Sequence, residues 1–133
     1  MSRYLLDTNI ISDLVRNPAG RAAGHLSRIG EEAVCTSIVV AAELRYGAAK
    51  KESRRLSTQL EAVLETLEIL PLEQPVDSIY AALRVNLEER GTIIGANDLL
   101  IAAHTMALDC ILVTDNEREF SRVASLTMEN WLR

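Results

Sequence analysis

The sequence has few aromatic residues and no long hydrophobic run. Only 4% of its 133 residues are aromatic although 48% are hydrophobic, so leucine, isoleucine, valine and alanine must form most of the core. No apolar run approaches the roughly 18 residues that a membrane-spanning helix requires, and Asp7 and Asn9 interrupt any early apolar segment of a signal peptide. A chain of this length can bury a sizeable core, so we expect one domain over residues 1–133.

Cysteine is also scarce. Cys35 and Cys110 each lie in a short apolar segment, and neither has a second cysteine or a histidine at metal-ligand spacing. We therefore expect two reduced thiols in buried strands rather than a disulfide or a zinc site. The same reasoning predicts a cytoplasmic location.

The chain has only two lysines, Lys50 and Lys51, against twelve arginines, and its net charge is −5. A nucleic-acid-binding protein is usually basic, so this balance argues against such a partner. A nucleic-acid substrate therefore requires that a bound metal ion or a local group of arginines supply the positive charge.

The first stretch of the chain reads as a strand, a polar turn and a helix. Residues 4–6 form a short apolar run that predicts a buried strand. Asp7, Thr8 and Asn9 follow, and their short side chains favour helix caps because they compete for backbone hydrogen bonds. A carboxylate at this point lies at the carboxyl edge of a sheet, where α/β proteins bind ligands. The simpler alternative is that Asp7 only caps the helix.

A second strand and helix follow with a similar pattern. Residues 33–36 predict a strand, Ser37 an N-cap, and residues 38–49 a helix that is apolar in its first turn. Glu43 interrupts this apolar face. A carboxylate near the start of a buried helix must be paired, protonated or bound to a metal, so Glu43 is a candidate site residue.

The middle of the chain predicts an amphipathic helix over residues 56–67, a short strand over residues 68–70 and another helix after Pro75. Arg84 stands at the edge of the apolar stripe of that last helix. We consider two roles for it, an ordinary surface residue whose stem covers apolar neighbours or a contact to phosphate.

Asp98 opens an apolar helix that we expect over residues 99–107. A carboxylate in the first turn of a helix is favoured by the helix dipole whatever its function. We expect His104 in the same helix to be a hydrogen-bonded core histidine. Residues 110–113 then predict the fourth strand.

Polar residues again follow this strand, namely Thr114, Asp115 and Asn116. An edge strand is expected over residues 125–128, and Trp131 is expected to close the core.

Strands that alternate with helices predict an α/β fold, here a single three-layer α/β/α domain with a mostly parallel sheet of about five strands. Asp7 and Asp115 follow strands, and Glu43 lies just below the same edge. Two successive helices precede the fourth strand, so the second can double back and begin with Asp98 at that edge. Four acids are therefore expected in one cleft.

Four carboxylates that lie close together repel one another and would have raised pKa values without a cation. A site with only oxygen ligands suits Mg²⁺, with Mn²⁺ as a substitute, better than zinc or copper. Such an ion activates water and neutralises charge on a phosphodiester. A bound metal ion would also explain how a chain with a net charge of −5 can act on an anionic nucleic acid.

The ordered motifs of the chain resemble those of PIN-domain ribonucleases, in particular the VapC-type toxins of bacterial type II toxin–antitoxin pairs. The resemblance covers nearly the full length. It is carried by Leu5-Leu6-Asp7-Thr8-Asn9, Ser37 with Glu43-Leu44 and Gly47-Ala48, Asp98 with Ile101-Ala102-Ala103, and Val113-Thr114-Asp115-Asn116 with Glu119-Phe120.

The resemblance implies that Asp7, Glu43 and Asp98 are the core acids and catalytic metal ligands, with Asp115 as the fourth. Asn116 and Glu119 remain alternatives for the fourth position. Residues with a substrate or supporting role are expected to include Thr8, Asn9, Ser37, Arg84, Thr114 and Asn116.

The resemblance further implies cleavage of RNA with Mg²⁺ or Mn²⁺ and a homodimeric protein. It also implies inhibition by a small DNA-binding antitoxin whose C-terminal segment enters the cleft. One alternative is a non-catalytic PIN-fold module that binds RNA or a partner. A phosphoaspartyl domain is another, but it would need a lysine near a later strand end, and both lysines lie in the turn at Lys50–Lys51.

Overall fold

The computed structural model describes residues 2–133 and contains one five-stranded sheet with strand order β3-β2-β1-β4-β5. All four pairings between neighbouring strands are parallel, which confirms the fold class expected from the sequence. The strands are β1 (Tyr4–Leu6), β2 (Val34–Ser37), β3 (Glu68–Leu70), β4 (Ile111–Val113) and β5 (Met128–Glu129).

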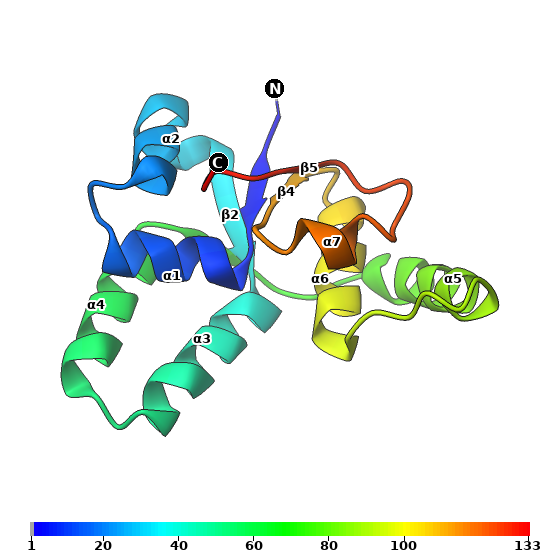
Figure 1. Cartoon of the computed structure of the whole chain (residues 1–133), viewed down its shortest axis with the longest axis horizontal. Helices are drawn as coiled ribbons and strands as arrows, with labels where there is room; N and C mark the ends of the chain where they lie inside the picture. Colours follow the sequence, from blue (N-terminus) through cyan, green and yellow to red (C-terminus); the bar gives the residue numbers. More distant parts are fainter. Residues whose placement is uncertain (1) are drawn as a thin grey trace.

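Seven α-helices connect and cover the strands in the part of the chain that the structure describes. Figure 1 shows α1 to α4 on one side of the central strands and α5 to α7 on the other. None of the helices formed by residues 2–133 is long and apolar enough to cross a membrane. The helices are α1 (Thr8–Arg16), α2 (Arg21–Ile29), α3 (Ile38–Lys50), α4 (Arg54–Glu65), α5 (Val76–Glu89), α6 (Ala96–Ala107) and α7 (Glu117–Phe120), with a 3₁₀ turn at Glu31–Ala33.

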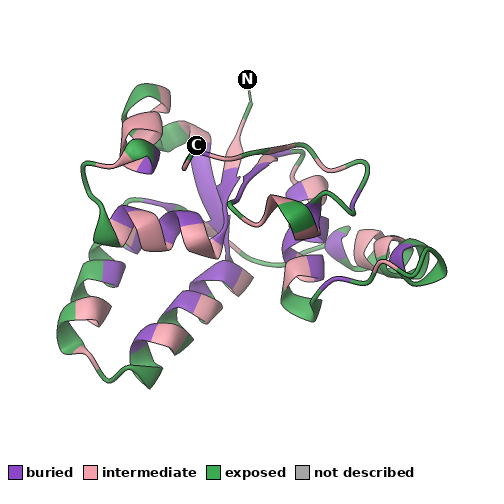
Figure 2. Ribbon diagram, in the orientation of Figure 1, coloured by how far each residue is buried: buried purple, intermediate pink, exposed green. Residues whose placement is uncertain are grey.

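Strand β1 is the centre of the sheet and of the core. Leu5 pairs with Cys35 of β2 on one side and with Leu112 of β4 on the other, and all three side chains are fully buried. Figure 2 shows the central strands as a buried region between the helices. Because helices cover both faces, these strands are continuously apolar rather than alternating. The residues just after β1 and β4 therefore emerge side by side at the carboxyl edge.

Some element boundaries differ from the sequence prediction. The last strand was expected over residues 125–128 but forms at Met128–Glu129, since Leu112 N donates to Thr127 O and Thr114 N donates to Glu129 O. Helix α6 begins at Ala96, so Asp98 lies within its first turn instead of opening it. The sequence pattern does not specify such boundaries because hydrogen bonds to a neighbouring strand or loop decide them.

Three predictions about buried residues are confirmed. Cys35 and Cys110 are free thiols in the core. Trp131 is fully buried, with its ring 5.5 Å from that of Tyr4 and stacked 5.3 Å from that of His25. His104 is 1% exposed, and its Nδ1 lies 2.8 Å from Ser37 Oγ.

Candidate active site

Asp7 lies at the junction of β1 and α1. Its backbone N–H donates to Val113 O at 2.9 Å, which extends the pairing of the central strands by one residue. Its carboxylate is 3% exposed and accepts two short hydrogen bonds, from Thr8 N to Oδ1 and from the Thr114 hydroxyl to Oδ2, both at 2.8 Å. Asp7 is thus the N-cap of α1 and also a buried acid at the sheet edge.

Thr8 joins this corner to α3. Its hydroxyl donates to Glu43 Oε1 at 2.9 Å, and the Asn97 side-chain amide donates to Glu43 Oε2 at 3.2 Å. Each oxygen of the Glu43 carboxylate therefore has one neutral donor. The sequence reasoning did not identify Asn97, although a polar residue directly before Asp98 at the start of an apolar helix was a usable signal.

Asp98 faces Glu119 at the opposite side of the site. The Asn116 side-chain amide lies 3.5 Å from Asp98 Oδ2 and 3.1 Å from Glu119 Oε2, so it bridges the two acids. The other Glu119 oxygen accepts a 2.8 Å hydrogen bond from Gly95 N, which joins α7 to the start of α6.

Burial and mutual repulsion raise the pKa of the acids at the centre. Burial raises the pKa of Asp98 to about 7, and the charges of Glu119, Asp7 and Glu43 add to the increase. Burial also raises the pKa of Asp7, while the hydrogen bonds from Thr114 and Thr8 oppose the shift.

Glu119 differs from these two acids because the hydrogen bond from Gly95 N lowers its pKa. Within residues 2–133, none of the acids Asp7, Glu43, Asp98 and Glu119 forms a salt bridge. The site therefore concentrates negative charge that neutral hydrogen-bond donors offset, with a smaller contribution from the charge of Arg122 near Glu119.

Asp115 is placed differently from the expectation that it is the fourth acid. Its side chain is exposed and accepts a 2.9 Å hydrogen bond from Asn130, while its backbone N–H donates to Asn9 Oδ1 at 3.0 Å. Glu119, and not Asp115, is among the charged residues that raise the pKa of Asp98. After β4 the backbone turns tightly, with Asn116 N donating to Thr114 Oγ1, so Asp115 points away and α7 brings Glu119 back.

Four of the residues predicted to have a substrate or supporting role differ in whether they contact the acids. Thr8, Thr114 and Asn116 contact the acids directly. Ser37 instead caps α3 through Val39 N and contacts His104, whose pKa burial lowers, so it supports the start of the helix that carries Glu43.

Arg84 lies on the exposed surface of α5. Its guanidinium donates to Tyr80 Oη at 3.1 Å and to Glu88 Oε2 at 3.3 Å, and both partners belong to the same helix. These contacts match the first of its two expected roles, that of a surface residue. No hydrogen bond among residues 2–133 connects Arg84 to the acids.

The acids of the site could serve as ligands for a metal ion. Among residues 2–133, no three His, Cys, Asp or Glu side chains are arranged closely enough to hold an ion, and Thr8, Asn97 and Asn116 donate hydrogen bonds to Glu43 and Asp98. The chemistry of the donors nevertheless fits a hard divalent cation, since all are carboxylates and none has a basic partner. Binding an ion requires these side chains to close around it.

Comparison with known proteins gives consistent matches over the whole chain. A family model described as "PIN domain" matches residues 4–126. "Ribonuclease VapC2" of Rickettsia felis is 38% identical over 130 residues, covering 96% of this chain and 97% of the relative. The "tRNA(fMet)-specific endonuclease VapC" of Shigella flexneri is 30% identical over 133 residues, covering 98% of this chain and 99% of the relative.

A solved structure also matches. The crystal structure of VapBC2 from Rickettsia felis bound to a DNA fragment from their promoter has a TM-score of 0.88 at 36% identity. The match covers 96% of this chain and 98% of the other.

The raised pKa of Asp98 predicts how stability depends on pH without metal. A folded-state pKa of about 7 lies well above the ordinary pKa of an aspartate, so the folded protein holds a proton that the unfolded chain loses as pH rises. This contribution to the free energy of unfolding is present near pH 4 and is lost as pH passes 7. In EDTA, Asp98→Asn should therefore gain in melting temperature relative to wild type between pH 5 and pH 8.

The matched control is Asp115→Asn, which removes one exposed carboxylate and should follow the wild-type profile. Parallel profiles for wild type and Asp98→Asn across this range would contradict the raised pKa of Asp98.

Proposed function

The chain belongs to the PIN domain family, and we propose that it is a metal-dependent endoribonuclease that acts as the toxin of a toxin–antitoxin pair. The observation that carries the proposal is the group of four facing carboxylates at the carboxyl edge of the sheet, none of which forms a salt bridge within residues 2–133. The ribonuclease and endonuclease names of its relatives support the reaction class. RNA and a DNA-binding antitoxin are both cytoplasmic, so we propose that location.

We assign Asp7, Glu43, Asp98 and Glu119 as the residues that hold Mg²⁺ or Mn²⁺. When bound, such an ion lowers the pKa of a coordinated water and neutralises charge on the phosphodiester. Neighbouring hydroxyl groups orient the acids that would hold the ion. Thr114 fixes one oxygen of Asp7, and Thr8 fixes one oxygen of Glu43, so two acids from distant elements keep a set orientation.

Asp7→Asn tests the proposed reaction. The amide oxygen can still accept from Thr8 N, so the α1 cap survives, and the lost Thr114 hydrogen bond costs about 1 kcal/mol. We expect the free energy of unfolding of the variant in EDTA to lie within about 1 kcal/mol of the wild-type value. We expect its rate of RNA cleavage to fall by about 100-fold or more. The measurement is cleavage of an RNA pool in Mg²⁺, Mn²⁺ and EDTA, together with thermal unfolding.

A wild-type protein that cleaves RNA in excess EDTA, or an Asp7→Asn variant that cleaves normally, would refute the proposal. Asp115→Asn serves as the charge-matched control because its side chain lies outside the group of facing acids.

The fourth acid is proposed to be Glu119 instead of Asp115. Glu119 shares Asn116 with Asp98 and is anchored through Gly95, whereas Asp115 is bonded to Asn130. Glu119→Gln should lower metal affinity by about 10- to 100-fold, while Asp115→Asn should leave it near the wild-type value. The Mn²⁺ affinity of each variant is measured from the rate of RNA cleavage as Mn²⁺ is titrated. A larger loss of affinity in Asp115→Asn than in Glu119→Gln would assign the ligand to Asp115.

We propose that the antitoxin places its C-terminal segment in a groove between α1, α3 and α4. The groove has a volume of about 190 Å³, and Thr8 and Glu43 lie in its wall, so its occupant reaches the acids. Arg16 and Lys51 supply positive charge along its rim. Its apolar wall suits hydrophobic side chains and is formed by Val15, Leu44, Ala48, Leu56 and Leu60.

Gly47 provides a test of this groove. It lines the groove on α3, and apart from its two chain neighbours and the nearby backbone of α3, no heavy atom lies within 4 Å of a Cβ atom added there. Gly47→Leu should therefore fold normally, fill the groove and weaken binding of the small protein encoded beside this chain by about tenfold or more. Ala49→Leu, on the exposed side of the same helix, is the control, and equal antitoxin binding by both variants would exclude the groove.

A homodimer is proposed through the exposed apolar face around α3. Ile38 is 42% exposed, Tyr46 66% and Leu72 39%, and the two hollows beside them share Leu100. Exposed apolar side chains grouped in this way mark interaction surfaces. Tyr46→Glu should shift the protein to a monomer in sedimentation, and an unchanged mass would exclude this face.

A further inference from the structure

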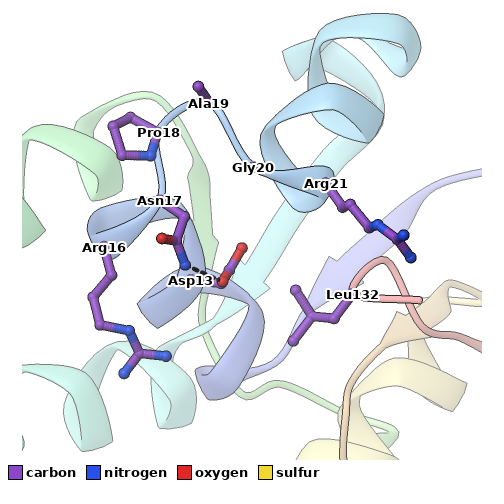
Figure 3. A pocket seen from close by; sticks show the side chains of 8 residues that line it. All are labelled: Asp13, Arg16, Asn17, Pro18, Ala19, Gly20, Arg21 and Leu132. Atoms are coloured by element: carbon purple, nitrogen blue, oxygen red, sulfur yellow. Dashed lines mark hydrogen bonds between the residues drawn. The ribbon is translucent and has the colours of Figure 1, made fainter.

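A group of unpaired arginines surrounds two adjoining hollows where α1 ends and α2 begins. One hollow of about 510 Å³ is formed by the end of α1, the connection to α2 and Leu132, as Figure 3 shows. The other, of about 520 Å³, lies along α2. Ala19, Gly20 and Arg21 line both hollows. We call this region the arginine surface and define it by Arg16, Arg21 and Arg28.

The three guanidinium groups lack protein partners. All three residues are exposed, and within residues 2–133 none of them forms a salt bridge. Some other arginines are paired, as in the Arg45–Glu61 bridge at 2.9 Å. Unpaired arginines grouped on a protein with net charge −5 form a local exception to its overall charge.

Two further charged side chains line the hollows. Arg133 lines the second hollow but lies 3.4 Å from Glu117, so its charge is partly offset. Asp13 is the one side-chain carboxylate lining either hollow within residues 2–133, and its Oδ1 accepts a hydrogen bond from Asn17 at 2.7 Å, drawn in Figure 3. Positive charge therefore dominates the surface.

The arginine surface connects to the site of the four acids through α1. Thr8 begins this helix and Arg16 ends it, so the two lie roughly 12 Å apart along the axis at 1.5 Å per residue. Arg16 also lines the groove that contains Thr8 and Glu43. A polymer that enters the site can therefore continue along α1 to Arg16 and then across Arg21 and Arg28.

We propose that the arginine surface binds the phosphate backbone of the RNA substrate next to the segment that is cleaved. The proposal rests on the ribonuclease function proposed above and specifies where the acidic protein holds its anionic substrate. Planar guanidinium groups bind phosphate with paired hydrogen bonds. Contacts of this kind position the nucleic acid without reading its sequence.

RNA is favoured over an antitoxin segment as the occupant of this surface. The groove assigned to the antitoxin includes Arg16, whereas Arg21 and Arg28 lie outside it on α2. The repeated charge of a nucleic-acid backbone matches separated arginines, while the apolar groove matches hydrophobic side chains.

The test is RNA binding by the full chain carrying Arg21→Gln and Arg28→Gln. The probe is a fluorescein-labelled, 20-nucleotide single-stranded RNA of mixed sequence, measured by anisotropy in EDTA so that it is not cleaved. We expect affinity to fall about tenfold at 50 mM salt and the slope of log K against log salt to become shallower by about 1.4, which is about 0.7 for each lost phosphate contact.

The control carries Arg45→Gln and Arg90→Gln, which remove the same charge from exposed positions that do not line the hollows. Its slope should equal that of wild type. An Arg21→Gln/Arg28→Gln variant with wild-type affinity and slope would overturn the proposal, as would an equal loss in both variants.

Two further measurements separate this proposal from the others. Cleavage of RNA by wild type in Mn²⁺ tests the ribonuclease function alone. If wild type does not cleave RNA but the Arg21→Gln/Arg28→Gln variant still binds RNA more weakly, the proposed reaction is wrong and the RNA-binding role of the arginine surface stands. If the variant binds RNA normally but binds the antitoxin more weakly, the surface belongs to the protein partner and the RNA proposal is wrong.

Discussion

The crowding of carboxylates that are wholly or partly buried is the constraint on which the rest of the site depends. Asp7 and Asp98 are held where burial and neighbouring charge raise their pKa values. The groups that hold the acids are neutral hydroxyls and amides, contributed by Thr8, Thr114, Asn97 and Asn116. An arginine in their place would offset the negative charge and, under the proposed function, would compete with the metal ion. The protein instead keeps a locally unfavourable arrangement that the proposed divalent ion would relieve.

The order of the strands explains how residues distant in sequence reach one corner. Because β1 lies between β2 and β4, the residues that follow β1 and β4 end up adjacent, and Thr114 can bond to Asp7 across 107 positions of sequence. Helices α1 and α6 begin at the same edge and bring Thr8 and Asp98. The apolar centre of the sheet thus fixes the positions of the polar residues at its carboxyl edge. Ligand groups of a binding site need such a rigid support.

Much of this arrangement could be predicted from the sequence because it follows from strand ends and helix starts. Asp7, Glu43 and Asp98 were identified in this way, and the structure brings them together. Asp115 was expected beside them, but the direction of a side chain in a tight turn depends on local hydrogen bonds that no periodic pattern encodes. Glu119 takes that place because α7 folds back over the edge. The arginine surface was not located, since only the packing of α2 beside the end of α1 brings its residues together.

Counting the protons released when Mn²⁺ binds tests the proposed metal site most directly. Asp98, with a pKa of about 7, is partly protonated near neutral pH, and a cation that occupies the site must displace that proton. Calorimetric titrations at pH 6.5 in two buffers of different ionisation enthalpy measure the release. We expect wild type to bind Mn²⁺ with net proton release and Asp98→Asn to lose both most of the affinity and the release. Tight binding without proton release, or no binding of Mn²⁺ by the wild-type protein, would contradict the account.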